Sequence, residues 1–148
     1  MQLSWSIEGD QQLLRKLQMV SSGIKDFSDP FRQTAEYLAD TFEKTFDVQG
    51  RNIGVIWPPL AASTIRQKAK NAPGAPMLVR TGAMRASFQK VYATDYARVW
   101  NSATYFKYHQ SKQPRTKIPR RQMMNLAEEQ KQTIVKFFHT YVQKIMSK

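Results

Sequence analysis

The chain has 148 residues, a formal net charge of +12 and no cysteine, which bounds it to about one domain and excludes disulfides, thiolate catalysis and cysteine zinc sites. It contains no apolar run long enough to cross a membrane and no secretory signal at its start, so we expect a soluble single domain over residues 1–148 with no membrane partner. The charge is divided unevenly, because residues 1–50 contain 5 Lys and Arg against 8 Asp and Glu, whereas residues 51–148 contain 18 against 3.

The first third of the chain predicts a short strand and two helices. Alternating apolar residues predict the strand over residues 3–7, and apolar residues at helical spacing predict the first helix over residues 11–22. Asp29 before Pro30 is typical of an N-cap followed by a first-turn proline, and the apolar stripe after it predicts an amphipathic helix to about residue 46. We interpret four acidic residues of this helix as its solvated face: Glu36, Asp40, Glu43 and Asp47.

The middle of the chain predicts a short helix and a β-hairpin. Because proline is excluded from helix interiors, the prolines that follow Trp57 permit a new helix only after them, over residues 61–70. Gly82 is interpreted as a turn residue with positive φ. Two runs rich in aromatic and β-branched residues, 88–94 and 97–100, predict the strands of the hairpin. Trp57 itself is predicted to anchor the core.

A basic stretch follows the hairpin. No acidic residue occurs between Asp95 and Glu128, and residues 104–123 show no strong apolar period, so we predict an exposed loop. Six cations in this stretch form the candidate interface with protein or DNA: Lys107, Lys112, Arg115, Lys117, Arg120 and Arg121. Because close like charges repel, these residues are expected to face a polyanion or an acidic surface. Replacing Arg120 and Arg121 with Glu is expected to leave the fold intact, because exposed charges contribute little to stability.

The last element is a long C-terminal helix. Asn125 with Glu128 three residues later resembles a capping box, and apolar residues recur on one face from Leu126 to Ile145. With the hairpin, this predicts an α+β fold, in which a small antiparallel β-sheet is covered by two or three helices and a long C-terminal helix closes the chain.

The sequence contains no recognisable catalytic site. Glu128 and Glu129 are explained by a first helical turn, and His109 and His139 have no second ligand at zinc-binding spacing. There is no phosphate loop, nucleophile elbow or paired-histidine metalloprotease motif. We therefore predict no enzyme, no catalytic or metal site and no cofactor.

Several short motifs nevertheless follow one another in order. They are a Trp-x-Pro-Leu start to a Thr- and Lys-bearing helix, a Leu-x-x-Thr-Gly turn, a Tyr followed by His-Gln, and an Ile-Pro-x-Arg stretch. The residues that carry them are Trp57, Pro59, Leu60, Thr64, Lys68, Thr81, Gly82, Tyr105, His109 and Pro119. Their order and spacing resemble the phage virion morphogenesis family, the tail-completion or neck proteins of tailed bacteriophages, from about Trp5 to Tyr141.

The resemblance implies a structural protein that forms a ring, or part of one, at the head-tail junction of the virion and is assembled in the host cytoplasm. The implied partners are further copies of the chain and other head-tail connector and tail proteins. As an alternative to a protein neighbour, the basic loop could contact DNA passing through the lumen, without reading its sequence. The uneven charge would suit head-to-tail contacts between copies. One departure concerns the residues after His109-Gln110, where the family usually has a glycine and this chain has Ser111 to Pro114.

Two alternatives belong to other classes. One is a small basic protein that binds nucleic acid without sequence preference, with residues 61–70 as the recognition helix and Arg66, Lys68 and Lys70 on phosphates. The other is a small metal-dependent nuclease, which would need clustered carboxylates to hold its ions.

Overall fold

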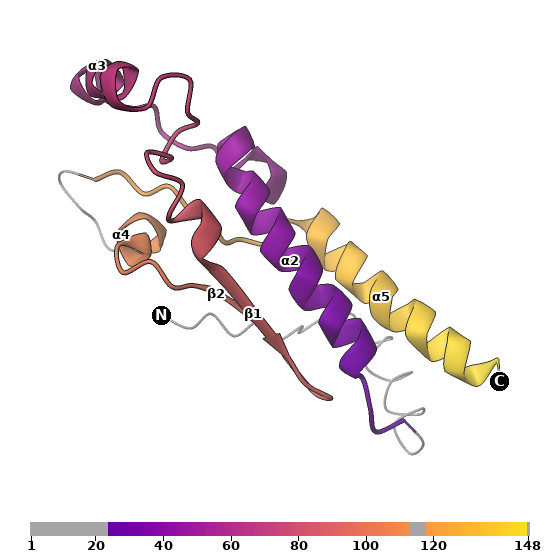
Figure 1. Ribbon diagram of the computed structural model, residues 1–148. Helices are drawn as coiled ribbons and strands as arrows, with labels where there is room; N and C mark the ends of the chain where they lie inside the picture. The colour runs from indigo at the N-terminus through magenta and orange to yellow at the C-terminus, as the bar shows by residue number, and fades with distance from the viewer. Residues whose placement is uncertain (1–23, 113–117, 148) are drawn as a thin grey trace.

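The computed structural model describes residues 24–112 and 118–147, which are drawn in colour in Figure 1. The strand expected over residues 3–7 and the helix expected over residues 11–22 lie outside these residues, as do Arg115 and Lys117. The described elements are α2 (Ser28–Val48), η1 (Arg51–Ile53), α3 (Ala62–Asn71), η2 (Arg85–Ser87), β1 (Phe88–Tyr92), β2 (Ala97–Asn101), α4 (Phe106–Gln110) and α5 (Glu128–Met146).

The predicted α+β class is confirmed. Strands β1 and β2 form the expected antiparallel hairpin, with Phe88 opposite Asn101 and Tyr92 opposite Ala97. The hairpin runs along α2, and α5 lies beside α2 with the opposite chain direction (Figure 1). Helix α3 projects beyond the end of α2, and α4 lies at the same end of the molecule.

Helix α2 is the central element of the fold, because its apolar residues recur at helical spacing and bury one face against its neighbours. Phe42 and Phe46 are fully buried. On the α5 side, Phe31 meets Phe138 edge to face with ring centroids 4.9 Å apart. On the sheet side, Phe42 and Phe46 contact Phe88 of β1. One helix therefore joins the sheet to the C-terminal helix.

The predicted N-cap of α2 is wrong. The helix begins at Ser28, whose N–H is bonded to the Asp26 carboxylate at 2.8 Å. Asp29 lies inside the first turn, where Arg32 donates to it at 2.7 Å and thereby lowers the pKa of this carboxyl. Pro30 is the third residue of the helix and not the first, and it is tolerated there because the first helical N–H groups have no intrahelical partner.

Trp57 is a core residue, as predicted. Its side chain is 4% exposed and meets Phe46 edge to face at 5.8 Å. Its indole Nε1 donates to the carbonyl of Gln122 at 2.8 Å. The turn after α2 fits closely against this ring, because a Cβ on Gly50 would lie 2.8 Å from Nε1. Gly50 also has φ of +87°, so a side chain is disfavoured there twice.

The predicted capping box of α5 is also wrong. The helix begins at Glu128, and the N–H of Ala127 is bonded to the Gln130 side chain at 3.0 Å. The Asn125 side chain instead donates to the carbonyl of Ile53 at 2.8 Å. Since this amide is engaged by a distant turn, the helix starts later than the local pattern indicates.

The stretch expected to be a loop over residues 104–123 contains α4. Phe106 attaches this short helix to the core, because its side chain is buried and its ring meets that of Phe88 edge to face, with centroids 5.9 Å apart. The turn interpretation of Gly82 is confirmed by its φ of +82°. Within residues 24–112 and 118–147, no helix combines the length and apolar character that crossing a membrane requires.

Replacing Trp57 with Ala is expected to lower the free energy of unfolding by about 3–5 kcal/mol, because the cavity would open beside Phe46. Urea denaturation measures this change. Trp57→Phe keeps an aromatic ring but loses the donor to Gln122, so its cost should be smaller. An unchanged melting temperature in Trp57→Ala would contradict the core role.

Candidate interaction surface

A largely buried segment without regular secondary structure, residues 121–124, organises the end of the molecule that carries α3 and α4. Met123 and Met124 are 0% and 1% exposed. The buried Gln110 side chain serves this backbone: its Oε1 accepts from the N–H groups of Met123 (2.9 Å) and Met124 (3.1 Å). Its Nε2 donates to the carbonyl of Met124 at 2.7 Å. One side-chain amide thus replaces the neighbouring strand that buried backbone normally needs.

Arg121 joins this segment to the chain before α3. Its Nε donates to the carbonyl of Pro58 at 2.9 Å, and its Nη2 donates to that of Pro59 at 2.8 Å. Its backbone N–H donates to the carbonyl of His109 at 3.0 Å. The prediction that Arg121 is an exposed cation is therefore wrong, because the residue is 5% exposed and its guanidinium is engaged internally. Burial also lowers the pKa of Arg121.

His109 lies half-buried at the end of α4. Its Nδ1 is buried, and no hydrogen-bond partner for it lies within the described residues. Burial lowers the pKa of His109, and the charge of Arg121 lowers it further. Both effects favour the neutral imidazole, so protonation would place a second charge beside a buried guanidinium.

Three of the six candidate interface cations remain exposed: Lys107, Lys112 and Arg120. The Nε of Arg120 donates to the carbonyl of Gln110 at 3.1 Å. The ammonium of Lys107 lies 5.3 Å from the centroid of the Tyr108 ring, which suits a cation–π contact. The structure thus brings these three cations together around α4, while Arg121 lies beneath them.

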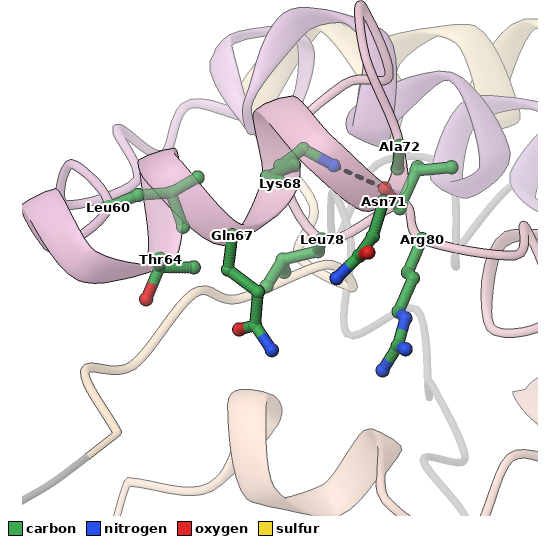
Figure 2. A pocket seen from close by; sticks show the side chains of 9 residues that line it. Leu60, Thr64, Gln67, Lys68, Asn71, Ala72, Leu78 and Arg80 are labelled. Atoms are coloured by element: carbon green, nitrogen blue, oxygen red, sulfur yellow. Dashed lines mark hydrogen bonds between the residues drawn. The ribbon is translucent and has the colours of Figure 1, made fainter.

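The motif residues on α3 and just before it line a groove of about 180 Å³ (Figure 2). Leu60, Thr64 and Lys68 face the segment that contains Leu78 and Val79. Lys68 Nζ donates a hydrogen bond to the carbonyl of Val79, drawn as a dashed line in Figure 2. This contact attaches α3 to the chain that returns from it, so Lys68 has a structural partner.

The remaining motif residues have different surroundings. Pro59 supplies a carbonyl to Arg121, and Thr81 Oγ1 accepts from the N–H of Ala83 at 3.3 Å in the turn of Gly82. Tyr105 is 44% exposed, and Pro119 is exposed as well. Most motif positions with described contacts therefore support the backbone, which leaves Tyr105 and Pro119 on the surface.

The acidic side of α2 is more than the solvated face that the sequence indicates. Arg85 of η2 pairs with Asp47 through two hydrogen bonds of 2.7 and 2.8 Å and approaches Glu43 at 3.7 Å. The two partners are 38 residues apart, so no local pattern predicts the pair. No cluster of three or more His, Asp or Glu suited to a metal ion occurs in the part of the chain that the structure describes.

One family of known proteins matches the chain. The sequence model of the phage virion morphogenesis family matches residues 8–143. No curated protein and no solved structure matches the chain significantly.

Replacing Arg121 with Met keeps the apolar stem but removes both hydrogen bonds to the proline carbonyls. We expect a loss of about 1.5–3 kcal/mol in the free energy of unfolding, the usual size for hydrogen bonds to a charged group. Arg120→Met is the matched control: it removes one hydrogen bond, to the Gln110 carbonyl, from an exposed residue and should cost only about 0.5–1 kcal/mol. Equal losses in urea denaturation would contradict the assignment.

The depressed pKa of His109 predicts acid sensitivity. The unfolded chain, with a His pKa of 6.5, binds this proton more readily than the folded chain. Stability contributed by the neutral imidazole should therefore be present at neutral pH and fall as the pH drops through 6.5, by at most about 1.4 kcal/mol per pH unit. In urea denaturation between pH 7.5 and 5, His109→Gln should make the free energy of unfolding less dependent on pH. An unaltered pH dependence would refute the role of His109.

Proposed function

The chain belongs to the phage virion morphogenesis family, and from this membership we propose that it is a non-enzymatic structural protein of the head-tail junction. In this proposal it forms a neck or tail-completion ring that joins the tail to the capsid. The observation that carries the proposal is the family match, which spans residues 8–143 of the 148.

The arrangement of charge supports a role in assembly. Arg121 ties the start of α3 to the end of α4, so the exposed cations near both helices belong to one basic end of the molecule: Arg66, Lys70, Arg80, Lys107, Lys112 and Arg120. Helix α2 has the opposite character, with five acidic residues against Arg32 and Lys44. A subunit with two such surfaces can meet its neighbour head to tail with complementary charges.

The cations around α4 would then face either an acidic neighbour or DNA in the lumen of the ring. Contacts with phosphate carry no sequence information, and each phosphate neutralised on duplex DNA adds about −0.9 to the slope of log affinity against log salt. The salt dependence of binding therefore distinguishes the two neighbours.

A small nucleic-acid-binding protein is the second candidate, because α3 is exposed along its length and carries Arg66 and Lys70. Lys68 is less suited to contact phosphate, because its ammonium is already bonded to the carbonyl of Val79. Such a protein should retain duplex DNA as a small species, without defined oligomers, and lose it steeply with salt.

A phage that lacks this protein is expected to accumulate filled heads and separate tails, which electron microscopy and sedimentation would count. Supplying Lys107→Glu/Lys112→Glu from a plasmid should fail to restore joined particles although its melting temperature is unchanged. Lys131→Glu/Lys136→Glu is the matched control, because it makes the same charge change on exposed residues of α5. Normal joining without the protein would reject the junction role.

A further inference from the structure

The outward face of α3 has no partner within the described chain. None of the helix residues is buried, and Ile65 is 55% exposed. Helical spacing gathers five residues on the side opposite the groove of Figure 2: Ala62, Ile65, Arg66, Ala69 and Lys70. We call these five residues the docking face. It is apolar along one side and basic along the other, and it lies on a helix that projects from the body (Figure 1).

A surface of complementary character lies between α2 and β1. It is a groove of about 410 Å³ whose half-buried apolar residues are Ala39 and Phe88. Three exposed acids of α2 line the same groove: Glu36, Asp40 and Glu43. The cations in its lining are Arg85, which is held mainly by Asp47, and Lys90. We call it the acidic groove.

We propose that the docking face of α3 in one copy occupies the acidic groove of the next copy. The inference rests on the proposed ring function and names the contact that would build the ring. The two surfaces lie at different places on the chain, since α3 projects past the end of α2 whereas the groove lies along its middle (Figure 1). Such a contact is heterologous, and repeating it generates a ring when the rotation closes.

Charge identifies the occupant as a second copy. Five acids of the described residues are on α2, and only four others are described: Asp26, Asp95, Glu128 and Glu129. The α2 face is therefore the main acidic surface available to Arg66 and Lys70 within another copy. Ile65 against Phe88 and Ala39 would supply the apolar contact, while the charges set the orientation.

The ion pairs that the acidic residues of the groove now make are weak enough to be replaced by contacts with another copy. Glu36 pairs with Arg32 at 3.1 Å and Asp40 with Lys44 at 2.7 Å, and all four side chains are well exposed. Exposed pairs of this kind contribute little to stability, so redirecting the carboxylates toward an incoming helix costs little.

Charge reversal tests the contact with the full chain. The helix variant is Arg66→Glu/Lys70→Glu, and the groove variant is Glu36→Lys/Asp40→Lys. Each alone places like charges across the contact and should weaken self-association at least about tenfold in sedimentation and native mass spectrometry. Mixed together, the two variants should associate again, because each face then meets an opposite charge. The chain with all four substitutions should also self-associate.

Lys131→Glu/Lys136→Glu is the control for net charge and should associate as the wild type does, and melting curves should show that every variant is folded. Failure of the wild type to associate in solution or on purified tails would overturn the ring, and this inference with it. Association of both variants at the wild-type level would overturn the docking contact and leave the ring standing. If the helix variant loses only its retention of duplex DNA, the face binds nucleic acid and the contact is refuted.

Discussion

The structure depends on the hydrogen bonding of a buried segment that is neither helix nor strand. Residues 121–124 run through the interior, and their backbone groups need partners because burial removes water. Gln110 supplies three of these hydrogen bonds, the Trp57 indole donates to the carbonyl of Gln122, and the backbone N–H of Arg121 donates to the carbonyl of His109. A polar network of this kind is costly when it is only partly satisfied, so losing one member is expected to destabilise this end of the molecule.

The need to hydrogen-bond this buried segment explains why several of the motif residues are present. The Trp-x-Pro-Leu motif provides the indole donor to Gln122 and the carbonyl of Pro59 that Arg121 uses. The His-Gln motif provides Gln110. The basic stretch therefore divides into an internal part, which fixes the positions of α3 and α4, and an external part, which remains free to meet a neighbour. The same sequence feature serves the fold and the proposed assembly through different residues.

Periodicity predicted the main elements well, since α2, the hairpin and α5 each depend on apolar spacing that local sequence displays. The starts of α2 and α5 were missed because Asp29 and Asn125 bond elsewhere. Local sequence places Arg121 on the surface, because its partners, Pro58 and Pro59, are 63 and 62 residues away and uncharged. The sequence likewise does not predict that α3 is exposed, because a short helix with few apolar residues does not show which of its faces packs against the rest of the chain.

The long-range bonds of the interior also have a consequence for synthesis. Asn125 reaches back 72 residues to Ile53, and Gln130 reaches back 78 residues to Asn52. A nascent chain that has emerged only as far as the hairpin lacks these partners, and its aromatic side chains on α2 remain without the cover of α5. Closure of the interior must wait until the ribosome has released nearly the whole polypeptide. A copy that is cut short before α5 would then expose the surface that holds the finished subunit together.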